Sequence, residues 1–194
     1  MKNSASQHRE PQVEILEATL RLFSAKGYFG TSMQDIRREA GVSIGAIYHY
    51  FKNKEEIATA LYDMLLEQMS ERTTHFLTTE KTFEAACQAM IKYLFAMAEQ
   101  KPHALQFLLY ARHREFLPNK QPICSAKPFE LLIDAGKRAM AAGEVRQMSP
   151  VVLVTMVFGS PFRLILLKVD GIMALPLADF FEESWECIWR AVAA

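Results

Sequence analysis

A run around residue 43 has the residue types of a hydrolytic nucleophile. Gly41, Ser43 and Gly45 fit the pattern G-x-S-x-G, in which a buried strand ends in a sharp turn that exposes the serine hydroxyl for attack on a carbonyl. The preceding residues 34–40 are charged and have helical spacing, unlike the apolar run of a buried strand. We therefore interpret Ser43 as a helix N-cap and predict that the chain is not an enzyme.

The elements around Ser43 favour a helix-turn-helix unit. A long first helix is expected to end at Gly27, and Thr31 begins a second helix as its N-cap, with Gln34 completing a capping box. Gly41 ends that helix, and Ser43 begins a third helix after a tight turn. Two short helices joined in this way, after a longer one, are typical of helix-turn-helix units, whose second short helix lies in the DNA major groove.

The third helix is expected to have one apolar and one open side. Ile47 and Phe51 share the side that must pack against the first helix. The residues that point away from this side or flank it are Ile44, Gly45, Ala46, Tyr48, His49 and Tyr50. Small residues let a helix backbone approach base edges, and tyrosine hydroxyls can hydrogen-bond phosphates. The helix N-termini at Thr31, Ser43 and Lys54 can direct backbone N–H groups at phosphates.

A family resemblance rests on residues 41–56, which read Gly-Val-Ser-Ile-Gly-Ala-Ile-Tyr-His-Tyr-Phe-Lys-Asn-Lys-Glu-Glu. This run resembles the DNA-binding signature of the TetR family of transcriptional regulators, and residues 18–40 resemble that family's first two helices. Carried over by position, the resemblance implies phosphate contacts from five residues: Thr31, Ser43, Tyr48, Tyr50 and Lys54. It implies base-facing roles for four more: Ile44, Gly45, Ala46 and His49.

Two of these base-facing positions depart from the family pattern. Ile44 and Ala46 are apolar, where some family members carry polar base readers. Base specificity is therefore expected to rest on His49, on apolar contacts with thymine methyl groups, and on DNA shape.

Helical spacing continues along the chain without alternating strand patterns, and predicts an all-α protein of about nine helices. After the first three, helices are expected at residues 54–78, 82–99, 102–116, 127–142, 149–168 and 177–193. We expect a three-helix DNA-binding domain in residues 1–54 and a helical bundle for ligand binding and dimerisation in residues 55–194. The first domain carries eight basic and five acidic side chains, a net charge of +3, and the second carries fourteen and seventeen, a net charge of −3. The neutral chain therefore combines a basic and an acidic part.

Composition narrows the class of protein further. A hydrophobic fraction of 51% excludes a disordered chain, and three cysteines are too few for a disulfide scaffold. Residues 1–12 lack the apolar segment of a secretory signal. The longest charge-free apolar stretch, residues 147–162, is shorter than the roughly 20 residues of a membrane span. We expect a cytoplasmic protein with no membrane association, no metal and no cofactor.

Phenylalanine and methionine side chains concentrate in the second domain, where a helical bundle can leave an adaptable apolar pocket. In the resembled family an inducer lies among the middle helices. This implies a small and apolar inducer, with these candidate contacts: Phe95, Phe107, Tyr110, Phe129, Met156 and Phe158. Arg112 is a further candidate, for an acidic ligand, although a solvated helix end is the favoured interpretation of Arg112.

The predicted helix at 149–168 is apolar on nearly all sides, so part of its surface should meet a second subunit. The last helix offers a complementary aromatic side. The resemblance implies the same arrangement, because family dimers pair their last two long helices into a four-helix bundle. The interface candidates are Val157, Leu164, Phe181, Trp185 and Ile188.

The sequence thus predicts a homodimeric, ligand-responsive transcriptional regulator. Its expected partner is a palindromic double-stranded DNA operator, from which a small-molecule inducer releases it as a repressor. The alternative is a helical adaptor that uses the same apolar surface for a protein partner and does not bind DNA. Salt-sensitive binding to DNA from upstream of its own gene distinguishes the two.

Overall fold

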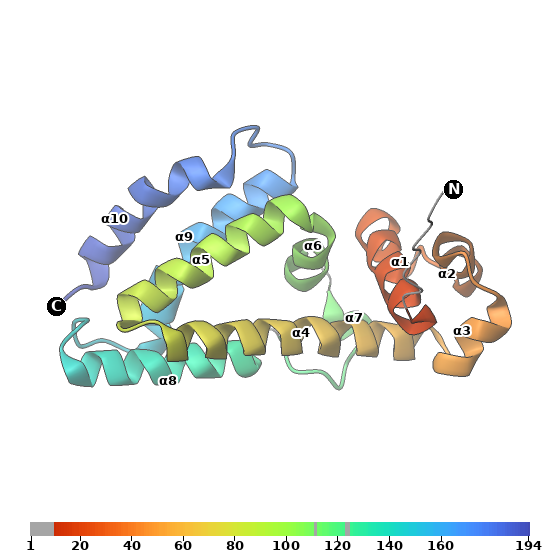
Figure 1. The fold of residues 1–194 in the computed structure, drawn as a ribbon, viewed down its shortest axis with the longest axis horizontal. Helices are drawn as coiled ribbons and strands as arrows, with labels where there is room; N and C mark the ends of the chain where they lie inside the picture. Colours follow the sequence, from red (N-terminus) through yellow and green to blue (C-terminus); the bar gives the residue numbers. More distant parts are fainter. Residues whose placement is uncertain (1–9, 111, 123–124) are drawn as a thin grey trace, which may run out of the picture. The chain divides into compact units, whose positions relative to one another are not determined.

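The computed structural model describes residues 10–110, 112–122 and 125–194, which are mostly helical (Figure 1). The β-structure within these ranges is a single antiparallel bridge between Val145 and Ala193. The predicted all-α fold is therefore confirmed for the described part of the chain.

The described residues form ten α-helices and one 3₁₀ helix. In chain order these are α1 (Pro11–Lys26), α2 (Met33–Ala40), α3 (Ile44–Tyr50), α4 (Lys54–Thr79), α5 (Phe83–Gln100), α6 (Pro102–Tyr110), α7 (His113–Phe116), α8 (Lys127–Ala142), α9 (Pro150–Val169), η2 (Leu177–Phe180) and α10 (Phe181–Val192).

Two predicted helices differ in the structure. The single helix expected at 102–116 is wrong, because Arg112 adopts non-helical backbone angles (φ −76°, ψ 69°) between α6 and α7. The apolar spacing continues across this position and gave no sign of the break, which allows Phe116 to stack on Tyr28. The last predicted helix begins as the 3₁₀ turn η2 before α10.

The chain divides into two compact units. The first comprises the chain up to Met64 together with Tyr110–Lys120, and the second comprises Leu65–Leu109 and Gln121–Ala194. The division falls inside α4, ten residues beyond the functional boundary predicted after residue 54. That functional boundary stays a prediction.

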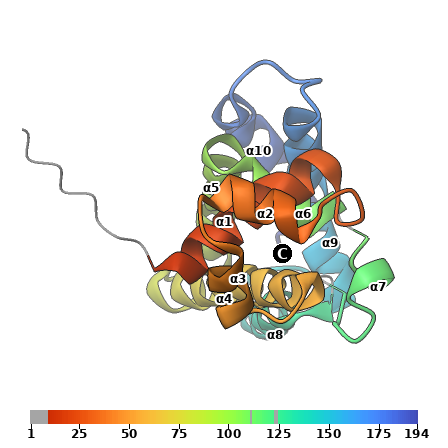
Figure 2. The same ribbon diagram turned by 90° about the vertical axis from the view of Figure 1, so that its right-hand side faces the viewer.

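The first unit is built on the packing of α1 against α2 and α3 (Figure 2). The buried side of α1 includes Ile15, Leu16 and Phe23, whereas Val13, at the start of the helix, is exposed. From α2 and α3, Ile36 and Ile47 contribute fully buried side chains. The short helices are therefore held by these apolar contacts, because a helix of seven or eight residues is not stable alone.

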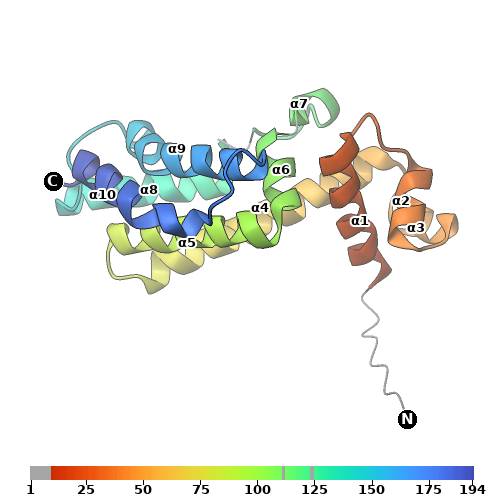
Figure 3. The same ribbon diagram turned by 90° about the horizontal axis from the view of Figure 1, so that it is seen from above.

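The second unit is arranged around α9, which packs against α5, α8 and α10 (Figure 3). Its buried residues Leu153, Val157 and Ile165 recur at helical spacing along one side. By length and composition alone α9 could also cross a membrane, a property that it shares with core helices of soluble proteins. Its packing against three neighbouring helices is that of a core helix.

Candidate nucleic-acid interface

Ser43 begins helix α3 as predicted. Gly41 ends α2 in the left-handed conformation (φ 68°, ψ 22°), which glycine adopts without steric cost. Ser43 Oγ then accepts a hydrogen bond from the backbone N–H of Ala46 at 3.0 Å. This confirms the N-cap. The element before Ser43 is helix α2, so the strand of a nucleophile elbow does not precede this serine.

The predicted division of α3 into two sides is confirmed. Ile47 is fully buried, and Phe51, which follows the helix, is also buried. The side chains of Tyr48 and Tyr50 are 53% and 39% exposed, and that of His49 is exposed between them. The His49 and Tyr50 rings meet edge to face, with centroids 4.9 Å apart.

The N-terminal end of α3 can approach another surface closely. Gly45 is exposed, and the nearest atom to a Cβ placed on it would be Ser43 Oγ at 3.9 Å. Ile44 and Ala46 beside it are half-buried. The helix therefore presents little side-chain bulk at this end, as close approach to base edges requires.

The predicted cap of α2 is wrong by one residue. Ser32 is the N-cap: its hydroxyl accepts from the Asp35 N–H at 3.1 Å, and the Asp35 carboxylate accepts from the Ser32 N–H at 3.0 Å. Thr31 is instead buried, and its hydroxyl donates to the Gly27 carbonyl at 2.8 Å. Both registers satisfy the capping-box pattern, so the sequence alone could not distinguish them. The Thr31 hydroxyl therefore already donates its hydrogen bond within the first unit.

The start of α4 is stabilised by its own side chains. Asn53 Oδ1 accepts from the Glu56 N–H, and Glu56 Oε2 accepts from the Lys52 N–H, both at 2.8 Å. Asn53 therefore caps the start of α4. Lys54 Nζ, predicted to contact a phosphate, donates instead to the backbone carbonyls of Tyr28 and Thr31, at 2.7 Å each.

Ionic contacts surround α2 and α3. Arg38 pairs with Asp35 and Arg21 pairs with Glu39, the latter at 2.8 Å. Hydrogen bonds from Ser32, assisted by Arg38, hold the pKa of the Asp35 carboxyl well below its usual range. Lys52, next to α3, extends an 87% exposed side chain and lies 3.7 Å from Glu56. This exposed cation adds to the basic character that an interface with phosphates needs.

Sequence reasoning missed the residues that hold this unit together from elsewhere in the chain. The Phe116 ring of α7 stacks on Tyr28, with centroids 4.3 Å apart and planes 10° apart. Lys120 Nζ donates to both carboxylate oxygens of Asp63, at 2.6 and 2.7 Å. These pairs are distant in sequence, and no local pattern indicates them.

Residues 15–61 match the family model of bacterial regulatory proteins of the tetR family. This match covers α1 from Ile15 onward, all of α2 and α3, and the start of α4. This part of the chain is therefore similar to the DNA-binding domain of tetR-family regulators.

Individual transcriptional regulators resemble the chain over different lengths. The HTH-type transcriptional regulator YhgD of Bacillus subtilis is 31% identical over 102 residues, which is 52% of each chain. A TetR-family transcriptional regulator of Haemophilus influenzae superposes with a TM-score of 0.75 at 26% identity, over 95% of this chain and 97% of that one. FadR of Bacillus subtilis, in complex with stearoyl-CoA, superposes with a TM-score of 0.78 at 21% identity, over 91% of this chain and 96% of that one. The chain spans about half the length of the curated relatives it matches.

The second unit contains an apolar cavity of about 180 Å³. Its lining residues come from α4, α5, α6, α8 and α9, and all have hydrocarbon, thioether or aromatic side chains: Leu66, Met69, Leu94, Leu105, Leu108, Leu109, Pro128, Phe129, Phe162 and Leu166. Phe129 is the one predicted pocket residue among them. Leucines that line a cavity and leucines that fill a core have the same helical spacing, so the sequence did not separate them.

The other predicted pocket residues lie elsewhere. Phe107 and Phe158 are buried in the core without lining this cavity, and Met156 is 40% exposed. Arg112 belongs to the first unit, where its 82% exposed side chain pairs with Glu115. The side chain of Tyr110 lies outside the described part of the structure.

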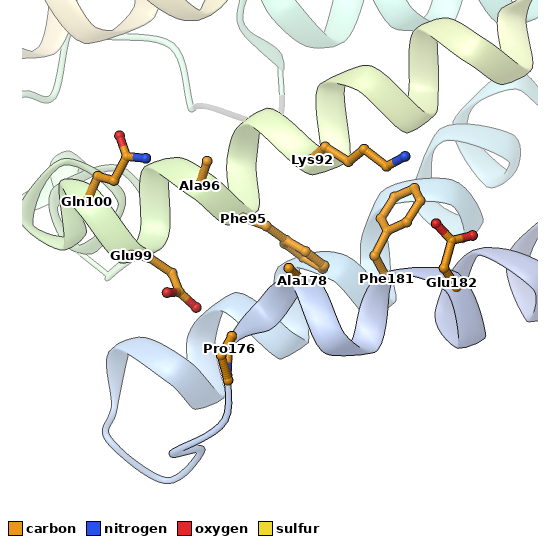
Figure 4. Close-up of a pocket in the computed structure, with 9 residues that line it drawn as sticks. All are labelled: Lys92, Phe95, Ala96, Glu99, Gln100, Pro176, Ala178, Phe181 and Glu182. Atoms are coloured by element: carbon orange, nitrogen blue, oxygen red, sulfur yellow. The ribbon is translucent and has the colours of Figure 1, made fainter.

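Phe95 lines a different hollow, an open groove of about 510 Å³ between α5 and the η2–α10 segment (Figure 4). Lys92 extends toward the Phe181 ring, with Nζ 4.3 Å from the ring centroid. Glu99 Oε1 accepts from the Leu177 N–H at 2.8 Å and so fastens the start of η2 to α5. The charged side chains distinguish this groove from the apolar cavity.

The predicted dimer residues are mostly buried within the chain itself. Val157, Phe181, Trp185 and Ile188 are each at most 6% exposed, and Leu164 is half-buried. The four buried side chains contribute to the core of their own chain, and their role in an interface stays a prediction. A helix that is apolar all round does not indicate which side faces inward.

Helix α9 nevertheless leaves one long side exposed. We call it the α9 outer face, and it consists of Val151, Val152, Thr155, Met156, Gly159, Ser160 and Arg163. Val151 is 60% and Val152 48% exposed, although both are apolar. Contiguous exposed apolar residues on a soluble protein are typical of an interaction surface.

Proposed function

We propose that the chain is a ligand-responsive transcriptional repressor, which binds a palindromic DNA operator as a cytoplasmic homodimer and is released by an apolar inducer. The exposed side of α3 is the observation that supports DNA binding most directly. Ile47 fixes the inward side of the helix, while Tyr48, His49 and Tyr50 remain open on the other. A helix presented in this way can enter the major groove.

The geometry favours a division of tasks along α3. The half-buried Ile44 and Ala46 and the exposed Gly45 would approach base edges, where apolar groups can contact thymine methyl groups. His49 would supply the polar base contact. The hydroxyls of Tyr48 and Tyr50 and the N-terminus of α3 at Ser43 would hold phosphates. Thr31 and Lys54 are left out of this set, because the Thr31 hydroxyl and two of the three N–H donors of Lys54 already bond within the unit.

The apolar cavity supports an inducer with a hydrocarbon part. A charged group placed among its lining side chains would lack a partner, and burying an unpaired charge is strongly unfavourable. We therefore propose that the part of the inducer inside the cavity is uncharged. An acyl chain is the first ligand to test, because the similar FadR structure contains stearoyl-CoA.

Helix α4 provides a route from ligand to DNA. It begins at Lys54, close after the recognition helix in the chain, and carries Leu66 and Met69 of the cavity lining. A ligand against these side chains would shift α4 and change the separation of the two recognition helices in the dimer. The operator would then fit only the ligand-free form.

The α9 outer face supports the dimer. In a homodimer the same surface meets its own copy about a two-fold axis, and small residues such as Gly159 and Ser160 allow two helices to approach closely. The exposed side of α10, with Glu182, Glu186 and Arg190, would complete the rim.

A salt titration of DNA binding tests the proposed function. The protein is mixed with DNA from upstream of its own gene, and the association constant is measured between 50 and about 200 mM salt. We expect specific binding that weakens steeply with salt. Tyr48→Phe and Tyr50→Phe, which remove one hydroxyl each, should lower affinity by about 2- to 10-fold, as one hydrogen bond of about 1 kcal/mol predicts.

Tyr93→Phe is the matched control, because Tyr93 lies on α5 and its ring contacts to Phe76 and Arg72 survive loss of the hydroxyl. Its DNA affinity should equal that of the unaltered protein. Absence of salt-sensitive binding, with all variants behaving alike, would favour a protein-interaction adaptor instead.

A further inference from the structure

The ammonium group of Lys54 is placed to act inside the protein. Its Nζ lies 2.7 Å from the backbone carbonyl oxygens of both Tyr28 and Thr31, and 4.2 Å from the centroid of the Tyr28 ring. Both carbonyls belong to the connection between α1 and α2. A single cation therefore ties the first residue of α4 to the turn that precedes α2.

The contacts of the Lys54 ammonium group belong to the stronger kinds of polar interaction. Hydrogen bonds from a charged donor are stronger than neutral ones, and a cation over an aromatic face adds further attraction. Partial burial of the site lowers the pKa of Lys54 and, together with Glu55, raises the pKa of Tyr28. The interaction is thus partly removed from water, where ionic contacts are less screened by salt.

Tyr28 is also held from the side of α7. Phe116 stacks on its ring at 4.3 Å, and Phe23 meets it edge to face at 5.4 Å. The ion pair between Lys120 and Asp63 fastens the segment that carries Phe116 to α4. The Tyr28 ring therefore has aromatic neighbours from α1 and α7 in addition to the cation from α4.

The position of this contact decides what it controls. Thr31 directly precedes Ser32, the N-cap of α2, and α2 leads through the turn at Gly41 into α3. Anchoring the Thr31 carbonyl to α4 therefore fixes where α2 begins, and with it the placement of α3.

We propose that Lys54 is a positioning residue for DNA binding: together with Phe116 it clamps Tyr28 and the start of α2, and it does not serve as a phosphate contact. This inference rests on the proposed DNA-binding function. The clamp itself exists without DNA, so its test has one arm without DNA and one with it.

The first arm measures hydrogen exchange of the backbone amides of residues 32–36 in the free, full-length protein. Lys54→Met retains most of the unbranched side chain and removes the ammonium group. It should accelerate exchange of these amides about ten-fold or more, because two charge-assisted hydrogen bonds are lost. Lys137→Met is the control, since it removes an exposed cation that pairs with Asp134 on α8. Equal exchange in all three proteins would overturn the clamp.

The second arm measures DNA affinity against salt. Losing a phosphate contact lowers the salt slope by about 0.9 for each phosphate released. We expect Lys54→Met to weaken binding about ten-fold or more at every salt concentration without changing the slope. Phe116→Leu, which changes no charge, should show the same pattern. Circular dichroism confirms that each variant retains its helices.

Lys54→Arg separates the two roles further. It keeps the charge that a phosphate contact needs, but a branched guanidinium cannot replace a single nitrogen that lies 2.7 Å from two carbonyls. The clamp predicts weak binding with an unchanged slope. A slope lowered by about 0.9 or more in Lys54→Met, with full affinity in Lys54→Arg and Phe116→Leu, would overturn the proposal.

If the unaltered protein shows no salt-dependent DNA binding, the proposed function and the DNA-binding role of Lys54 are both wrong. The hydrogen-exchange measurement still decides whether the clamp exists.

Discussion

Ser32 and Asp35 satisfy each other's backbone at the start of α2. The Ser32 hydroxyl accepts from the Asp35 N–H at 3.1 Å, and the Asp35 carboxylate accepts from the Ser32 N–H at 3.0 Å. An eight-residue helix has few other stabilising contacts at its N-terminus, where backbone N–H groups lack intrahelical partners. This reciprocal pair therefore sets the residue at which the helix-turn-helix begins.

The capping pair makes stability depend on pH. The pKa of Asp35 is lower in the folded protein than its ordinary value of 3.8, so the folded state favours the ionised carboxylate. The ionised Asp35 carboxylate contributes fully to the stability of the folded protein above pH 3.8, and this contribution is lost as pH falls toward the lower pKa of the folded state. Asp35→Asn should lower the thermal midpoint at pH 7, and the difference from the unaltered protein should shrink below pH 3.8.

Asp134→Asn provides the comparison for this prediction. Asp134 also has a lowered pKa, through its hydrogen bond to Lys137, but it caps no helix and lies exposed on α8. Its substitution should change the midpoint much less. If the difference in thermal midpoint between Asp35→Asn and the unaltered protein stayed constant from pH 7 down to pH 2.5, the capping carboxylate could not be its cause.

Ile47 should be the most sensitive position of α3 for folding. It is fully buried, so Ile47→Ala leaves a cavity and should destabilise the protein by about 2–5 kcal/mol, whereas Ile47→Val should cost about 0.5–1.5 kcal/mol. Urea unfolding followed by circular dichroism measures both. Val13→Ala, at a 38% exposed apolar position of α1, should stay within about 0.5 kcal/mol. Equal effects at residues 13 and 47 would contradict the assigned sides.

Gly159 offers a clean test of the dimer surface. No atom lies within 4 Å of a Cβ placed on it, so both Gly159→Ala and Gly159→Arg fit the single chain. Sedimentation should show that Gly159→Ala remains dimeric. Gly159→Arg should become monomeric, because a long charged side chain would separate the paired helices. A dimer that tolerates the arginine would place its interface elsewhere.

The apolar cavity should prefer neutral chains to charged ones. A ligand that binds only the folded protein raises its stability, by about 2.7 kcal/mol at a hundred times its dissociation constant. We expect 1-decanol to raise the thermal midpoint more than decanoate does, since the lining offers no charged partner to a carboxylate. Leu108→Trp, which fills part of the space, should reduce the response to 1-decanol. Stronger stabilisation by decanoate would point to a charged subsite.

The parts that could be predicted from sequence are those set by local spacing. The N-cap at Ser43, the buried side of α3 and the helical ends at Gly27 and Gly41 follow from residues within one or two turns of each other. Local spacing did not settle the cap of α2, because Thr31 and Ser32 both satisfy the pattern.

Long-range contacts account for the rest. The break at Arg112 and the role of Lys54 depend on Tyr28 and Phe116, which meet only in the folded chain. The inward side of α9 depends on its neighbours, because apolar residues surround the helix. For the same reason the cavity residues resembled ordinary core residues.

Whether α3 reads DNA is tested most directly by hydroxyl-radical footprinting on DNA from upstream of the gene at physiological salt. We predict two protected half-sites about one helical turn apart, roughly 10–10.5 base pairs, or a multiple of this spacing. Protection should require more of the Tyr48→Phe, Tyr50→Phe double variant than of the unaltered protein, whereas Tyr93→Phe should protect at the same concentration. No protection by the unaltered protein, or protection that the double variant leaves unchanged, would contradict DNA recognition by α3.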